Sequence, residues 1–375
     1  MAEALFEETD VFVAGEHGVA EYRIPALVTT NAGTLLAVCD ARVDRPGDAP
    51  NNIDMVLKRS DDLGRTWSER EVLIDLPGEM AAGDPCMLVD RRTGAVWIFY
   101  DHVYPSMAVL RAMDPERAEG AQPGYQGRVL FLHAIRSDDD GRTWSEPIDL
   151  TPAVKDPAWI AAMAGPGMGI QTRAGRLIAP GYRRPAGDFR DDGSHLYVSD
   201  DHGETWRVSA SPGPNTNEGQ VVELEDGSLM LNMRSTRGPR CRAVATTTDG
   251  GETWSAMRDD ERLVEPRNQA SFIRWTDRRD GHARSRLLFA NTAHAESREN
   301  MTVRLSYDEG ESWPVAKVVN PGPTAYCCLS VLPDMTVGLL YEYRGLPDGP
   351  APGYEKITFA RFSAEWLTDG EDALD

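Results

Sequence analysis

The stretch Ser60-Asp61-Asp62-Leu63-Gly64-Arg65-Thr66-Trp67 decides the fold of this chain, because its pattern recurs five times. The shared pattern is [ST]-x-D-x-G-x-[ST]-W, and its copies span residues 60–67, 137–144, 199–206, 247–254 and 306–313. The Asp can accept hydrogen bonds from nearby backbone N–H groups, the Gly permits a positive φ, and the Trp can anchor the turn by burial. Each copy therefore predicts a hairpin turn, and the chemistry must lie between the copies.

The spacing of the copies predicts a repeated sheet. Neighbouring copies begin between 48 residues (199 to 247) and 77 residues (60 to 137) apart, which suits one four-stranded propeller blade with variable loops. Short alternating or β-branched runs are expected strands, at residues 34–39, 54–58, 95–100, 127–135, 220–224, 228–233, 287–290 and 337–343. We therefore predict an all-β fold, a six-bladed β-propeller that uses residues 1–375 as a single domain.

Two segments are expected to depart from this pattern. Residues 105–126 are rich in Met, Pro, Glu and Gly, and predict a long loop with one short helix. The acidic tail at residues 369–375 is expected to fray.

Composition narrows the range of partners. The formal net charge of −21 repels polyanions, so nucleic acid and anionic membrane surfaces are disfavoured. The N-terminus has no secretion-signal pattern and no run of 18 apolar residues occurs, so we expect a cytoplasmic protein. Five cysteines without C-x-x-C spacing predict reduced thiols, and we expect neither a metal nor a cofactor. An anionic substrate would require a local cluster of arginines.

Four segments outside the repeats carry polar and charged residues. They are Tyr22-Arg23-Ile24-Pro25 with Asp40-Ala41-Arg42 and Asp48; Asn217-Glu218-Gly219 with Asn232-Met233-Arg234; Ser297-Arg298-Glu299; and Tyr326-Cys327-Cys328 with Tyr341-Glu342. Together with the five repeats, they resemble the bacterial exo-α-sialidases, or neuraminidases. The resemblance spans residues from about 20 to 345 and implies a sialidase-like propeller.

The resemblance also implies how a substrate would be held. A sialic acid carries its carboxylate on the anomeric carbon, and fixed guanidiniums recognise such a group bidentately. The arginines implied in this role are Arg23, Arg234 and Arg298, with Glu342 holding Arg23 in position. Further residues implied to line the pocket are Asp40, Arg42, Gln269, Ser271 and the loop at residues 165–171.

The catalytic roles follow from the same resemblance. Sialidases use a tyrosine nucleophile, which avoids the repulsion between an anionic nucleophile and the substrate carboxylate. Tyr326 would attack the anomeric carbon while Glu218 accepts its proton. Asp48 would protonate the leaving oxygen and later activate water, so the product would retain its configuration.

The assignment of Asp48 rests on its position. From the local sequence alone, a turn-forming Asp is an equally good interpretation, and Asp44 and Asp54 lie close by. The placement of Asp48 five residues before Ile53 selects it.

Three functions remain open at this point. The first is a retaining exo-α-sialidase that acts on sialylated glycans or small sialosides. The second is the same fold acting on a deaminated or N-glycolyl nonulosonic acid, or transferring sialic acid as a trans-sialidase. The third is a non-catalytic carbohydrate-binding propeller, because the repeats alone imply no activity. The complete set of Asp48, Glu218, Tyr326 and three arginines favours an enzyme.

Overall fold

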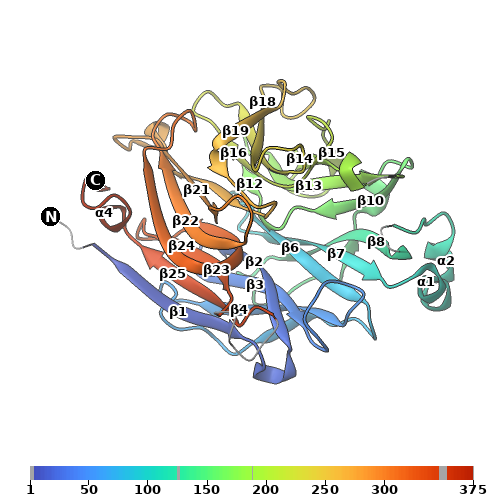
Figure 1. Cartoon of the computed structure of the whole chain (residues 1–375). Helices are drawn as coiled ribbons and strands as arrows, with labels where there is room; N and C mark the ends of the chain where they lie inside the picture. The colour runs from blue at the N-terminus through green and yellow to red at the C-terminus, as the bar shows by residue number, and fades with distance from the viewer. Residues whose placement is uncertain (1–3, 125–126, 188, 346–352, 375) are drawn as a thin grey trace.

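The computed structural model describes residues 4–124, 127–187, 189–345 and 353–374. About 49% of the chain is strand and 8% is helix, so the predicted all-β class is confirmed. Figure 1 shows the sheets following one another around the molecule in chain order, with the two ends of the chain on the same side. Every strand run predicted from the sequence falls on a strand of the structure.

The first half of the chain forms two sheets. The nine-stranded sheet has the order β2 (Glu21–Thr29), β3 (Leu35–Arg42), β4 (Ile53–Ser60), β6 (Ala81–Val89), β7 (Val96–Tyr104), β8 (Val129–Ser137) and β9 (Ile148–Asp149), with β5 (Glu71–Ile74) beside β4 and β11 (Gly167–Met168) beside β6. The five-stranded sheet has the order β10 (Trp159–Ala164), β13 (Leu177–Pro185), β14 (Gly193–Ser199) and β15 (Arg207–Val208), with β12 (Ile170–Gln171) beside β13.

The second half also forms two sheets. The four-stranded sheet has the order β16 (Thr216–Glu223), β17 (Leu229–Ser235), β18 (Cys241–Thr247) and β19 (Arg258–Val264). The seven-stranded sheet has the order β1 (Phe6–Val13), β25 (Lys356–Phe362), β24 (Val337–Tyr343), β23 (Val315–Val331), β22 (Glu299–Ser306), β21 (Arg286–Thr292) and β20 (Ser271–Thr276). Because β1 pairs with β25, the first strand of the chain is fastened to the last.

The repeats form the predicted turns, one after each of β4, β8, β14, β18 and β22. In the first copy, Asp62 accepts hydrogen bonds from the amide (2.9 Å) and hydroxyl (2.7 Å) of Thr66. Gly64 adopts a φ of 85°, and its amide donates to the Ser60 hydroxyl at 2.9 Å. The tryptophan is fully buried only in the third copy, where Trp206 is 6% exposed; in the other four it is half-buried.

The turn glycines allow each turn to press against a neighbouring sheet. A Cβ added to Gly64 would lie 2.0 Å from the Phe359 ring, and one added to Gly203 would lie 2.2 Å from Trp97. Both contacts are far shorter than a van der Waals distance, so only glycine fits. The repeats therefore join successive sheets as well as successive strands.

One expectation about the irregular segments needs correction. The described part of the segment at 105–126 holds two short helices instead of one, α1 (Met107–Met113) and α2 (Pro115–Ala118), because Ser106 and Asp114 cap their N-termini. In the described part of the acidic tail, whose fraying stays a prediction, the Asp372 carboxylate forms an ion pair with Arg286 (2.8 Å). Further helices within the described ranges are η1 (Glu16–Gly18), α3 (Thr151–Val154), η3 (Phe189–Asp191), η4 (Arg278–Asp280) and α4 (Ala364–Leu367).

Three features of the described residues bear on the expectations from composition. All five cysteines are buried and unpaired. No helix in the described ranges is both long and apolar enough to span a membrane. Within the same ranges, no cluster of three His, Cys, Asp or Glu side chains could hold a metal ion.

Candidate active site

A cavity of about 480 Å³ gathers polar side chains from strands that lie far apart in the sequence; we call it the site cavity. Among the residues that line it are Arg23, Asp40, Arg42, Asp48, Glu218, Arg234, Arg298 and Tyr326. The structure therefore brings together most of the residues proposed from the sequence. Glu342 is fully buried directly behind them.

Tyr326, Glu218 and Arg234 form one hydrogen-bonded group. The Tyr326 hydroxyl, on β23, donates to Oε1 of Glu218 at 2.6 Å. Arg234 lies on β17, next to the strand β16 that carries Glu218, and donates from one nitrogen to Oε2 of Glu218 (2.6 Å) and to the Tyr326 oxygen (2.8 Å). Burial, together with the charge of Glu218, raises the pKa of Tyr326, so its resting form is the neutral phenol.

The buried Glu342 carboxylate fixes two parts of the site at once. Its Oε1 accepts from Nε of Arg23 (2.6 Å) and from the amide of Ile24 (2.7 Å). Its Oε2 accepts from the Tyr326 amide at 3.0 Å. Because the carboxylate is 0% exposed and fully paired, it holds the Arg23 guanidinium and the Tyr326 backbone in fixed positions.

Three guanidiniums surround the Tyr326 ring. Cζ of Arg23 lies 5.3 Å from the ring centroid and Cζ of Arg298 lies 5.5 Å from it, while Arg234 contacts the hydroxyl. No described carboxylate forms an ion pair with Arg298, in contrast to the other two arginines. Such a convergence makes a local positive field within a protein whose net charge is −21.

Asp48 stands at the mouth of the site cavity. Its side chain is 80% exposed, and Oδ1 accepts from the buried Arg42 guanidinium at 2.8 Å. Desolvation opposes ionisation, yet the charges of Arg42 and Arg23 hold the pKa of Asp48 below its usual value. Asp48 is therefore ionised near neutral pH in the free protein, and its acid form is the minor one.

The two neighbouring aspartates lie elsewhere. Neither Asp44 nor Asp54 lines the site cavity. Asp44 is exposed, whereas Asp54 is buried, and burial together with the charge of Asp75 raises the pKa of Asp54 to about 6. Of the three carboxylates in this segment, Asp48 is the one that faces the other site residues.

Asp84 lines the site cavity but was missed by the sequence reasoning. Burial, followed by the charges of Glu218 and Asp48, raises the pKa of Asp84 to about 7, so this carboxyl can carry a proton near neutrality. Its backbone has a φ of 57°, and its amide donates to Asp40 Oδ1 at 3.0 Å. The only sequence signal was its place between Gly83 and a proline, which belongs to no motif.

Gln269, Ser271 and the loop at residues 165–171 do not line the site cavity. Gln269 is 1% exposed and its amide bonds both backbone groups of Cys327, at 3.0 Å each. Met168, in the loop, packs against three hydrophobic clusters from different sheets. Gln269 and Met168 therefore pack inside the protein, and Gln269 holds the backbone of the residue next to Tyr326.

The chain is similar to known proteins over most of its length. The model of the BNR repeat-like domain matches residues 33–341. A sialidase of Micromonospora viridifaciens is 40% identical over 97% of this chain and 55% of its own length. An exo-alpha-sialidase of Aspergillus fumigatus is 30% identical, with 94% of this chain and 86% of the relative covered.

A solved structure, of a Hadza microbial sialidase, matches with a TM-score of 0.82 at 35% identity, over 96% of this chain and 69% of that one. This chain spans little more than half of the Micromonospora relative, at 55%. The family match nevertheless covers most of the chain, and the fold is of the β-propeller type. The chain belongs to the family of sialidases with BNR repeats.

Proposed function

We propose that this protein is a retaining exo-α-sialidase that hydrolyses terminal sialic acids from sialylated glycans or small sialosides. The observation that carries the proposal is the 2.6 Å hydrogen bond from the Tyr326 hydroxyl to Glu218, set among three arginines. A neutral phenol bonded to a carboxylate is an activated nucleophile of the kind that covalent catalysis requires.

Recognition rests on the arginines. Arg23, Arg234 and Arg298 would hold the substrate carboxylate by charge-assisted hydrogen bonds, and Glu342 keeps the first of them in place. The substrate carboxylate also accounts for a nucleophile that is neutral at rest. A carboxylate nucleophile would be repelled by the substrate carboxylate, whereas a phenol is not.

In the first step, the Tyr326 oxygen attacks the anomeric carbon and its proton moves to Oε1 of Glu218. The bond to the leaving oxygen breaks as Asp48 donates a proton to that oxygen. Arg234 keeps its contacts with both Glu218 and Tyr326 and stabilises charge on the phenolic oxygen.

In the second step, water attacks the anomeric carbon and gives its proton to Asp48. The bond to the Tyr326 oxygen breaks, and Glu218 returns the proton to the phenol. Two displacements at one carbon retain its configuration.

We also propose that the propeller has six blades. The two halves of the nine-stranded sheet meet through a single parallel pairing, Ile53 with Ala81. In the seven-stranded sheet, β23 pairs through its first part with β22 and through its last part with β24. If each of these two sheets is counted as two blades and each of the other two sheets as one, the structure has six blades of about four strands each.

The test is a panel of matched aryl α-glycosides of N-acetyl, N-glycolyl and deaminated sialic acid. We expect hydrolysis of at least the N-acetyl sugar, with the α-anomer as the first product in proton NMR spectra. Added lactose distinguishes hydrolysis from transfer, because a trans-sialidase would form a new sialoside. Turnover of none of the three sugars by folded protein would refute the proposal.

A further inference from the structure

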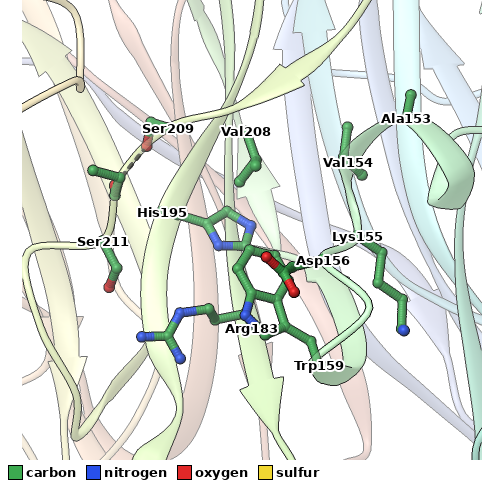
Figure 2. Close-up of a pocket in the computed structure, with 11 residues that line it drawn as sticks. Ala153, Val154, Lys155, Asp156, Trp159, Arg183, His195, Val208, Ser209 and Ser211 are labelled. Atoms are coloured by element: carbon green, nitrogen blue, oxygen red, sulfur yellow. Dashed lines mark hydrogen bonds between the residues drawn. The ribbon is translucent and has the colours of Figure 1, made fainter.

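A second cavity, of about 430 Å³, lies beside strands β13 and β14 of the five-stranded sheet. Figure 2 shows the residues that line it. Arg183 and Arg184 are consecutive on β13, so their side chains point to opposite faces. Arg184 lines the site cavity, whereas Arg183 lines the second cavity together with Trp159 and His195. The two cavities are therefore separated by the sheet itself.

The second cavity contains a buried side chain with unsatisfied polar atoms. His195 is 0% exposed, and neither ring nitrogen has a hydrogen-bond partner among the described residues. Its ring is held by stacking on Trp159 (centroids 5.5 Å apart) and by an edge contact with Tyr197 (4.8 Å). Burial, together with the charge of Arg183, lowers the pKa of His195 to about 3. The His195 ring is therefore neutral, and both of its nitrogens are buried.

Two cations border the same cavity. No described carboxylate lies within ion-pairing distance of Arg183 or Lys155, although most arginines of this acidic chain are paired. Asp156 is the one acidic residue of the lining, so the cavity carries an excess of positive charge. A guanidinium that lacks an internal partner is suited to a carboxylate from outside.

The remaining surface suits a sugar ring. Trp159 is half-buried, so part of its side chain remains open beside the Arg183 guanidinium, which lies 5.6 Å from the ring centroid. Val154 and Val208 add apolar surface, and a pyranose presents C–H faces that pack on such surfaces and hydroxyls that seek polar atoms. Figure 2 draws His195, Arg183 and Trp159 close together at the centre of the lining.

We propose that this cavity is a second ligand site for a sugar that carries a carboxylate. The carboxylate binds Arg183 and Lys155, and a C–H face of the sugar packs against the open part of Trp159, which the buried His195 ring holds in place by stacking. The site is distinct from the proposed catalytic one, because the two share no lining residue.

The test uses D-glucuronate as the probe and D-glucose as its neutral match. The whole protein is labelled with 5-fluorotryptophan, and the resonance of Trp159 is identified by its loss in Trp159→Phe. A Tyr326→Phe background removes turnover. Titration is followed by fluorine NMR up to roughly 50 mM, which exceeds the Kd of millimolar ligands.

We expect glucuronate to shift the Trp159 resonance saturably, and glucose to bind about tenfold more weakly or not at all. Arg183→Leu should weaken glucuronate binding about tenfold or more. To check that this variant folds, the same substitution is made in the protein that keeps Tyr326, where its hydrolytic activity should be unchanged. The matched control is Arg207→Leu, on the adjacent strand β15, whose guanidinium is already paired with Glu252 (2.8 Å) and which should bind like the parent.

Three outcomes would overturn the proposal. The first is a Trp159 resonance that glucuronate leaves unshifted. The second is an equal response to glucose and glucuronate. The third is binding that is unchanged in a folded Arg183→Leu protein.

Discussion

The Tyr326 hydroxyl and the Glu218 carboxylate, 108 residues apart in the chain, are joined by a 2.6 Å hydrogen bond. The same carboxylate accepts from Arg234, so the proton acceptor of the proposed reaction and the phenol share one guanidinium. This arrangement lets the phenol lose its proton only as the new bond forms, because burial otherwise disfavours the phenolate.

Replacing the three arginines one at a time should separate their effect on transition-state binding from their effect on the free energy of unfolding. Alanine at Arg23, Arg234 or Arg298 should weaken transition-state binding by about 2–4 kcal/mol each, measured as kcat/KM, and lysine should restore only part. Arg298→Ala should change the free energy of unfolding by less than about 0.5 kcal/mol, because no described carboxylate depends on it.

Arg23→Ala should behave differently in urea unfolding. It leaves the fully buried Glu342 without its ion-pair partner, which should cost about 3–5 kcal/mol of stability. Equal stability of the Arg23 and Arg298 variants would contradict the role given to Glu342, and unchanged kcat/KM in all three alanine variants would refute the recognition model.

Asp48→Ala should show a dependence on the leaving group. Activity toward natural glycosides, whose leaving oxygen needs a proton, should fall by roughly a hundredfold or more. Aryl glycosides with good leaving groups should be affected much less. Asp44→Ala is the matched control, because Asp44 lies in the same loop but outside the site cavity. Equal losses on both substrates would remove Asp48 from the acid role.

The pKa of Asp48 also predicts a pH dependence. Because Arg42 and Arg23 hold this pKa below its usual value, the required acid form becomes more abundant as the pH falls. For natural glycosides, kcat/KM should therefore rise as the pH falls from neutrality. The rise should be weaker for activated aryl glycosides. A pH profile that is the same for both substrates would speak against Asp48.

The sequence predicted best what is decided locally. The repeat turn follows from Asp62 and Gly64 alone, because their hydrogen bonds and φ angles involve only the next few residues. The pairing of distant segments around Tyr326 was predicted only through the family resemblance. Asp84 was missed because its raised pKa comes from burial and from carboxylates on other segments. Gln269 was placed at the pocket rim although it bonds the backbone beneath Tyr326, a contact that no local pattern encodes.

Buried histidines should make the protein less stable in acid. Burial, followed by the charge of His133, lowers the pKa of His102 to about 3, whereas an unfolded histidine titrates near 6.5. The unfolded state therefore binds a proton that the folded state refuses, and stability falls as the pH drops below about 6.5. At pH 5 this group alone should cost about 2 kcal/mol relative to neutral pH.

His102→Phe isolates that contribution. The ring stacks on Tyr104 at 4.8 Å, and neither of its nitrogens has a partner among the described residues, so phenylalanine can replace it. Between pH 7 and pH 5, the free energy of unfolding of the variant should fall by about 2 kcal/mol less than that of the parent, as measured by urea unfolding. The exposed His17→Asn is the control and should keep the parent slope. If the unfolding free energy of His102→Phe depended on pH as strongly as that of the parent, His102 would not be a source of the loss of stability in acid.

The glycine of the first repeat turn should be irreplaceable for two separable reasons. Gly15, outside the repeats, serves as the reference for the backbone effect alone. Its φ is 88° and no atom lies near an added Cβ, so Gly15→Ala should lower the free energy of unfolding by about 1–2 kcal/mol. Gly64→Ala adds the collision with Phe359 to a similar φ of 85°, and should cost about 1–3 kcal/mol more. Equal losses of unfolding free energy in the two variants would show that the turn does not press on the neighbouring sheet.

The most direct test of the central claim is covalent trapping with a 3-fluoro sialosyl fluoride, which slows breakdown of the glycosyl-enzyme. After brief incubation and proteolysis, peptide mass spectrometry locates the sugar. The proposed mechanism predicts a single label on Tyr326, present in the parent and absent from Tyr326→Phe. A label on Glu218 or on any other carboxylate would contradict it.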